Sequence, residues 1–264
     1  MDKIIAIVSS LFYCLAIATI VPGLVHKTGI KAKAVFISAV IALILHGWLL
    51  TDLIFNHGGQ NLTIVNVASI VSFIISLVMT ITMTRARLWF MLPLVYSFGA
   101  IIVSLAAFLP GTFITHLEHN AKLTFHISLA LFSYSTLTIA AIYALQLAWL
   151  DYKLKQKKAL AINPNLPPLL MIERKLFHII LVGYLLLTGT VLTGFFYISE
   201  IFGTGNGHKA VFSFIAWMVY SVLLWGHYRQ GWRGRKVTWY ALGGVTLLTI
   251  GYFGSRLIRE LILH

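Results

Sequence analysis

Eight long apolar runs constrain the fold of this chain more than any other feature. They lie at 4–24, 34–55, 63–83, 88–108, 124–150, 173–198, 210–227 and 237–257, separated by shorter polar stretches. A helix needs about 20 apolar residues to cross the hydrocarbon core of a bilayer. Each run is therefore predicted to be a transmembrane helix, and the fold class is all-α, a polytopic membrane bundle of about eight helices.

Composition supports this interpretation and excludes a water-soluble enzyme. Of the 264 residues, 59 % are hydrophobic and only 10 % are charged, and the mean hydropathy is +0.90. The single cysteine, Cys14, rules out an internal disulfide and a Cys-x-x-Cys-His haem attachment. The chain is therefore not itself a c-type cytochrome.

Positive charge is distributed unevenly among the connections. The 20 Lys and Arg against 7 Asp and Glu give a formal charge of +13, and the cations concentrate in every second connection, beginning after the first run. In a soluble protein such an excess would suggest nucleic acid, but cytoplasmic loops of membrane proteins also carry excess Lys and Arg. We assign the basic connections to the cytoplasm and both termini to the outside (N-out, C-out). A bacterial inner membrane is the expected location, with the lipid bilayer as partner and no nucleic acid.

The longest connection, 151–171, combines four lysines with three prolines. Its charge is interpreted as the cytoplasmic signal, with contact to anionic lipid; recognition of a partner protein is the alternative. This connection could divide the chain into a five-helix and a three-helix part. No convincing internal repeat accompanies such a division, and we predict one integral-membrane domain over 1–264.

Histidine is the unusual intramembrane residue of this sequence. The few acids form no pair suited to proton pumping or acid–base catalysis. Four of the ten histidines lie within or at the ends of predicted helices: His46, His126, His178 and His227. Neutral imidazole is a common metal ligand and a usual axial ligand of haem iron. These four are candidate ligands, against the alternative that each only hydrogen-bonds a neighbouring helix.

Distances from flanking basic residues place the four histidines at different depths. At 1.5 Å per residue, His178 and His227 lie roughly 3 to 5 Å inside the cytoplasmic boundary and form a level pair. His126 lies roughly 6 Å inside the outer boundary, and His46 roughly 20 Å from its cytoplasmic marker, Lys33. His46 is therefore expected to face His126 or to mark a separate site.

Two stretches of the C-terminal half, 124–264, resemble the cytochrome c assembly membrane proteins of the CcsA, CcmC and HemX superfamily. They are HISLALFSY at 126–134 and LWGHYRQGWRGR at 224–235. Over its whole length, including IVPG at 20–23 and THLE at 115–118, the chain is similar to the YpjD-type inner-membrane proteins.

The resemblance implies that the protein handles haem. In the assembly members, external histidines hold haem near a Trp-rich loop, and a histidine pair within the membrane holds haem closer to the cytoplasm. His126 matches the first external histidine, and His227 matches the membrane histidine before the basic turn. His46 is a candidate membrane partner on the YpjD-type pattern, whereas His178 falls where assembly members often carry arginine. Only His264 lies near the place of the second external histidine.

One departure from the family limits what the resemblance implies. The assembly proteins present haem on a Trp-Trp-Asp type loop, but this chain has GTGNGH at 203–208. The leading hypothesis is thus a non-enzymatic membrane protein that binds b-type haem non-covalently and moves, stores or senses it. Histidine supplies the axial bond to iron, and Arg229 pairs with a propionate. The alternatives are a transporter or accessory subunit for a small solute or metal, and a structural partner of other membrane proteins without a cofactor.

Overall fold

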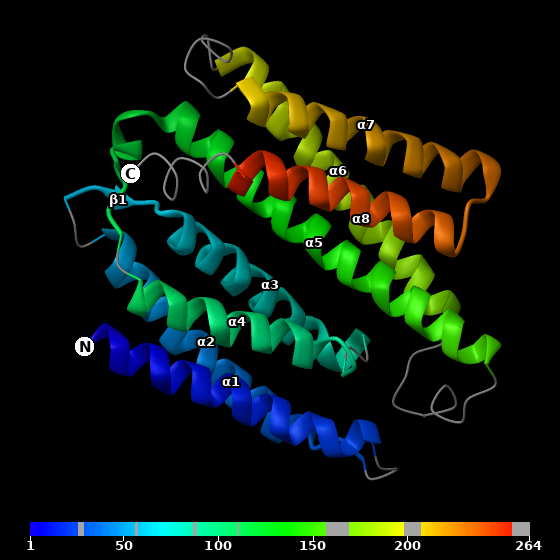
Figure 1. Cartoon of the computed structure of the whole chain (residues 1–264), viewed down its shortest axis with the longest axis horizontal. Coiled ribbons are helices and arrows are strands. Elements are labelled where there is room, and N and C mark those ends of the chain that lie inside the picture. The colour runs from blue at the N-terminus through cyan, green and yellow to red at the C-terminus, as the bar shows by residue number, and fades with distance from the viewer. Residues whose placement is uncertain are drawn as a thin grey trace. The chain divides into compact units, whose positions relative to one another are not determined.

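The computed structural model describes residues 1–25, 29–55, 58–86, 89–109, 111–156, 169–197 and 207–254. These residues form eight α-helices (Figure 1): α1 (Asp2–Val25), α2 (Ala32–Phe55), α3 (Ile64–Ala86), α4 (Leu92–Phe108), α5 (Ala121–Lys155), α6 (Leu169–Tyr197), α7 (Gly207–Gln230) and α8 (Arg235–Thr249). Two short strands, β1 (Gln60–Asn61) and β2 (Ile114–Thr115), and a 3₁₀ turn at Leu117–His119 lie in the connections, and a π-helical turn at Ile250–Gly254 extends α8. The predicted all-α class is confirmed.

Membrane-spanning length is met by most of these helices. Seven are long and apolar enough to cross a bilayer, and the remaining apolar helix is α4, with 17 residues. Large apolar side chains such as Trp48, Ile81 and Phe195 are exposed on the helix surfaces. In water such surfaces would be unfavourable, whereas lipid tails are as apolar as these side chains. The chain is therefore a multi-pass membrane protein.

The first compact unit contains α1 to α4. Serine hydroxyls join its helices through backbone carbonyls: Ser9 Oγ donates to the carbonyl of Ala42 at 2.9 Å, and Ser10 Oγ donates to that of Ala100 at 3.0 Å. Such small polar residues let membrane helices approach closely.

A short antiparallel sheet connects the loops at one end of this unit. β1 pairs with β2, and Gln60 lies opposite Thr115. The Asn61 side chain strengthens this pairing, because its Nδ2 donates to the carbonyl of Gly111 at 3.0 Å and its Oδ1 accepts from the N–H of Phe113 at 2.8 Å. The α2–α3 and α4–α5 connections are thus held together.

The second compact unit contains α5 to α8. Ser133 Oγ of α5 donates to the carbonyl of Gly183 in α6 at 3.2 Å. The Tyr220 hydroxyl of α7 donates to the carbonyl of Ala241 in α8 at 3.1 Å. A Cβ at Gly183 would collide with the side chain of Leu137, so glycine permits the close contact of α5 with α6.

The division of the chain differs from the five-plus-three arrangement considered from the sequence. Each unit contains four helices, because α5 hydrogen-bonds α6 and α8 and belongs with them rather than with α1 to α4. The long connection at 151–171 therefore joins α5 and α6, two helices of the second unit, although residues 153–168 group with the first unit. Its residues 157–168, with the prolines and two of its lysines, lie outside the described residues.

Candidate functional site

His227 lies in the last turn of α7 and is held by the turn that follows it. Gly231 adopts a left-handed φ of 66°, and its N–H donates to the carbonyl of His227 at 3.1 Å. This arrangement ends the helix and directs the chain backwards. The Trp232 ring then packs on Gly226, where a Cβ would collide with the indole. The Gly-Trp-Arg-Gly motif identified in the sequence is therefore a fold-back turn over the end of α7.

The turn determines which nitrogen of His227 carries the proton. Nδ1 lies 3.2 Å from the carbonyl oxygen of Trp232. A carbonyl only accepts hydrogen bonds, so Nδ1 must donate and the neutral ring must carry its lone pair on Nε2. A hydrogen bond that fixes the tautomer in this way is typical of metal-ligating histidines.

Phe177, rather than His178, contacts His227. The rings of Phe177 and His227 stack with their centroids 3.3 Å apart and their planes at 12°. Phe177 is buried, whereas His178 is exposed, because neighbouring positions on a helix point in different directions. The structure thus brings α6 and α7 together beside His227 but does not pair the two histidines. Arg229, in the same last turn of α7, is exposed.

His126 lies near the start of α5 and contacts the end of α6. Its Nδ1 is 3.0 Å from Thr193 Oγ1, and that hydroxyl also donates to the carbonyl of Gly189 at 2.7 Å. Because the hydroxyl proton is directed to the carbonyl, the Thr193 oxygen accepts from Nδ1. The lone pair of His126 is therefore also on Nε2, and its ring is only partly buried.

His126 and His227 cannot bind the same iron atom. His126 contacts Thr193 and His227 stacks on Phe177. Both contacted residues lie on α6, so the length of helix between them gives the separation of the two histidines. The distance from Phe177 to Thr193 along α6 is about 24 Å at 1.5 Å per residue. The two histidines therefore mark two separate positions, one at each end of the second unit.

His46 occupies a different environment, in the core of the first unit. It is fully buried, and both ring nitrogens are engaged: Nδ1 lies 3.1 Å from the Tyr13 hydroxyl and Nε2 lies 2.9 Å from Ser69 Oγ. The rings of Tyr13 and Phe73 each form a T-shaped pair with the imidazole, with centroids 6.0 and 5.4 Å away. No ring nitrogen of His46 is free for a metal in this arrangement.

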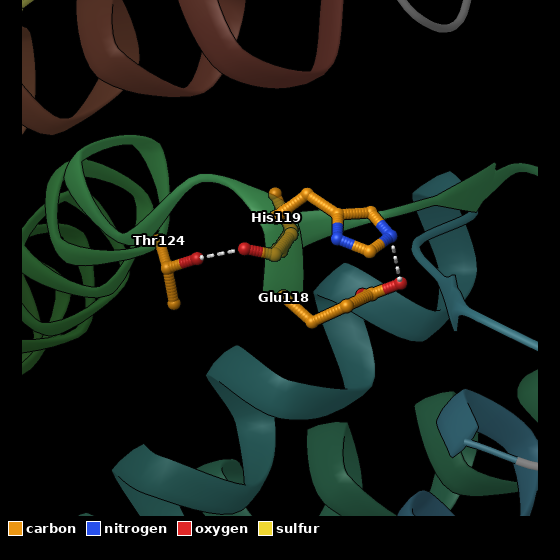
Figure 2. A network of polar contacts seen from close by, with 4 residues as sticks. Glu118, His119 and Thr124 are labelled. Carbon is orange, nitrogen blue, oxygen red and sulfur yellow. Dashed lines mark hydrogen bonds and ion pairs between the residues drawn. The ribbon is translucent and has the colours of Figure 1, made fainter.

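The connection before α5 carries a further polar group. Figure 2 shows Glu118 and His119 on the 3₁₀ turn, with His119 Nε2 3.6 Å from Glu118 Oε1. Thr124 Oγ1 donates to the carbonyl of Leu117 at 2.8 Å and ties this turn to the first turn of α5 (Figure 2). The His119 and Glu118 side chains are largely exposed, so this pair stabilises the turn only weakly.

Sequence reasoning missed the residues that orient the candidate ligands. Thr193, the partner of His126, lies 67 residues away in the sequence, so no local pattern indicates the contact. Phe177 and the carbonyl of Trp232 contact His227 through tertiary packing and a backbone turn. Of these residues, only Trp232 belongs to a motif noted in the sequence, the Gly-Trp-Arg-Gly stretch after His227. Two predicted features lie outside the described residues: the loop at 203–206 and His264. His208, which begins α7 with Gly207, has a buried Nε2 without a hydrogen-bond partner among the described residues.

The fold and these histidines define a class: a polytopic helical membrane protein with an anchored histidine at each end of one four-helix unit. The sequence profile of the family described as "Cytochrome C assembly protein" matches residues 34–263. The chain belongs to this family, which confirms the resemblance noted from its motifs.

Individual relatives agree with this assignment. The chain is 51 % identical over 261 residues to the inner membrane protein YpjD of Escherichia coli strain K12, covering 98 % of this chain and 99 % of that protein. It is 31 % identical over 84 residues to the cytochrome c biogenesis protein CcsA of Synechococcus, covering 31 % and 27 % of the two chains. No solved structure matches the chain. The name of the first relative and the membrane-length helices indicate a multi-pass protein of the inner membrane.

Proposed function

We propose that the protein binds b-type haem non-covalently through histidine and moves, stores or senses it, without transforming a substrate. Membership of the cytochrome c assembly family supports a haem-related function. Bound haem would supply a redox-active iron with an axial position for imidazole. The protein would supply the ligands and an apolar environment for the porphyrin.

The tautomers of His126 and His227 carry this proposal. Each has Nδ1 engaged, with Thr193 Oγ1 or the carbonyl of Trp232, and each presents Nε2 as the nitrogen with the free lone pair. A hydrogen bond at Nδ1 that leaves the Nε2 lone pair available is the arrangement typical of metal-ligating histidines. The residues present therefore fit haem ligation at two positions. The exposed guanidinium of Arg229, two residues after His227, is suited to pair with a propionate there.

His46 and His178 fit haem less well than the other two. His46 would have to lose its hydrogen bond with Tyr13 or Ser69 before a nitrogen could bind iron. His178 is exposed, whereas its neighbour Phe177 makes the contact with His227. We therefore assign the axial bonds to His126 and His227 and a structural role to His46.

The proposal includes eight transmembrane helices with both termini outside. The 17 residues of α4 rise about 25 Å, which is close to the roughly 30 Å hydrocarbon thickness when flanking residues snorkel. An even number of spans places the basic connections after α1, α3, α5 and α7 on one side. In this orientation His227 lies at the cytoplasmic end and His126 at the outer end.

Absorbance of protein purified from haem-replete membranes tests the proposal. We expect a Soret band and a pyridine haemochrome of b type in the wild type. His126→Gln and His227→Gln should each lower haem content, and the double variant should abolish it. His178→Gln is the matched control, because it removes an exposed histidine from the same unit. A wild type without a Soret band, or a double variant with full haem content, would contradict the proposal.

A further inference from the structure

The geometry around His227 depends on the short segment that follows α7, in which the Trp232 N–H donates to the carbonyl of Gly226 at 3.0 Å. Trp232 and Arg233 lie between Gly231 and Gly234, which adopt left-handed φ values of 66° and 63°. Glycine populates many backbone conformations at little cost. The hydrogen bond of the Trp232 N–H fixes the start of the two-residue segment between these glycines, and side-chain contacts act on the rest of it.

The carbonyl that orients His227 belongs to the peptide between Trp232 and Arg233. Its oxygen accepts the hydrogen bond from His227 Nδ1. The direction of this oxygen changes if the peptide plane rotates, and the plane is bounded by the α-carbons of Trp232 and Arg233. Contacts of both residues therefore act on the direction of this oxygen, in addition to the hydrogen bond of the Trp232 N–H.

Trp232 supplies the first anchor through its ring. The indole packs on Gly226 and lies beside the Tyr240 ring, with the centroids 5.2 Å apart. Lys236 lies in the following helix, α8, and its ammonium is 5.5 Å from the indole centroid. These contacts hold the Trp232 side of the peptide against the end of α7 and the start of α8.

Arg233 supplies the second anchor through an ion pair with α6. Its Nε lies 3.2 Å from Glu173 Oε1, and the exposed fractions of the two side chains are 67 % and 9 %. Glu173 Oε1 makes no hydrogen bond among the described residues, so this ion pair is the interaction that compensates its charge. A buried carboxylate without a partner is strongly unfavourable, so Glu173 holds Arg233 in place.

We propose that Glu173 is a positioning residue for His227, acting through Arg233 and the Trp232 carbonyl. Glu173 and Phe177 lie four residues apart on the same face of α6, so one helix face both stacks on the His227 ring and anchors the turn that sets its tautomer. Part of this inference, the effect on haem, rests on the proposed function. The effect on the His227 ring does not.

Nitrogen-15 NMR of histidine in the full-length, haem-free protein in nanodiscs tests the inference directly. The His227 signals are assigned by their loss in His227→Gln. We expect the wild type to show His227 as a single tautomer with the proton on Nδ1, and Glu173→Gln and Arg233→Gln to show a mixture of tautomers. Glu118→Gln is the matched control, because it removes an exposed ion-paired acid from another part of the chain. Unchanged His227 signals in Glu173→Gln would overturn the inference.

Haem binding provides the second measurement, made in a His126→Gln background so that the His227 position is read alone. Loss of an orienting partner costs about 10- to 100-fold in metal affinity at typical sites, and we expect a loss of this size in Glu173→Gln. The double variant Glu173→Gln/Arg233→Gln should be no weaker than either single variant, because all three release the same turn. Arg233→Lys should retain most of the affinity. Independent, additive losses would overturn the inference.

The two measurements separate the inference from the proposed function. A tautomer change in Glu173→Gln, together with a wild type that binds no haem, would support the positioning role and contradict haem binding. Normal haem binding at His227 in the wild type, with an unchanged tautomer and affinity in Glu173→Gln, would support haem binding and contradict the positioning role.

Discussion

Replacing His46 tests its assignment as a structural residue rather than a haem ligand. His46→Leu fills the core with an apolar side chain of similar size. It removes both hydrogen bonds of His46, with Tyr13 at 3.1 Å and with Ser69 at 2.9 Å. His46→Gln is the matched variant, because its amide can both donate and accept and so can pair with the two hydroxyls. Glutamine does not replace imidazole as an axial ligand of haem.

The expected magnitude follows from the two hydrogen bonds. Hydrogen bonds between membrane helices average about 0.6 kcal/mol and reach about 1.7 kcal/mol. His46→Leu leaves two buried hydroxyls without this partner, so we expect a loss of roughly 1 to 3 kcal/mol in the free energy of unfolding. His46→Gln should lose less than about 1 kcal/mol if the amide restores both contacts.

Two assays on the same preparations distinguish the roles. Unfolding in mixed detergent and SDS micelles, followed by far-ultraviolet circular dichroism, measures the stability of each variant. The pyridine haemochrome measures haem content per folded protein, and we expect wild-type content in both variants. A folded His46→Gln protein that has lost haem would refute the structural assignment, and a His46→Leu protein as stable as the wild type would refute the energetic reasoning.

Three further predictions concern the histidine anchors and the topology. Gly226→Ala should destabilise the protein by about 1 to 3 kcal/mol and shift tryptophan emission, because the new Cβ collides with the Trp232 ring; unchanged unfolding would contradict the close packing. Thr193→Val should weaken haem binding at the outer position about tenfold through loss of the Nδ1 partner, as measured by haem titration in a His227→Gln background; equal affinity would argue against that ligand. In a chain without other cysteines, an impermeant maleimide added to intact spheroplasts should label Asn120→Cys and not Gln230→Cys, and the opposite pattern would reverse the orientation.

The sequence indicated the candidate ligands because polar side chains are energetically unfavourable in membrane helices, and not because they form a recognisable motif. A polar side chain in a membrane helix is unfavourable without a partner, so His46 and His227 were conspicuous among apolar neighbours. The same reasoning could not separate a ligand from a packed core residue. His46 and His227 look alike in the sequence, yet His46 is enclosed by Tyr13 and Ser69 whereas His227 keeps one nitrogen available.

The pairing of His178 with His227 illustrates why depth alone was insufficient. His178 adjoins Phe177, which stacks on His227, so the two histidines lie at a similar level along their helices. Depth along a helix, however, says nothing about the direction of a side chain around its axis. The interface of α6 and α7 selects Phe177, whose neighbour His178 then points to another face. Packing between helices therefore replaced the expected histidine pair by an aromatic stack.

Length and hydropathy by themselves determined that the chain forms a bundle of membrane helices, because the bilayer requires every backbone polar group of a span to be paired within a helix. The stretches at 126–134 and 224–235 likewise indicated the family. Only the tertiary structure decided that α5 belongs to the second four-helix unit, and that Thr193 and the Trp232 carbonyl orient His126 and His227. These outcomes depend on contacts between residues that are distant in the sequence. Helices approach closely at small residues and hydroxyl groups, and no single apolar run encodes which helices will meet.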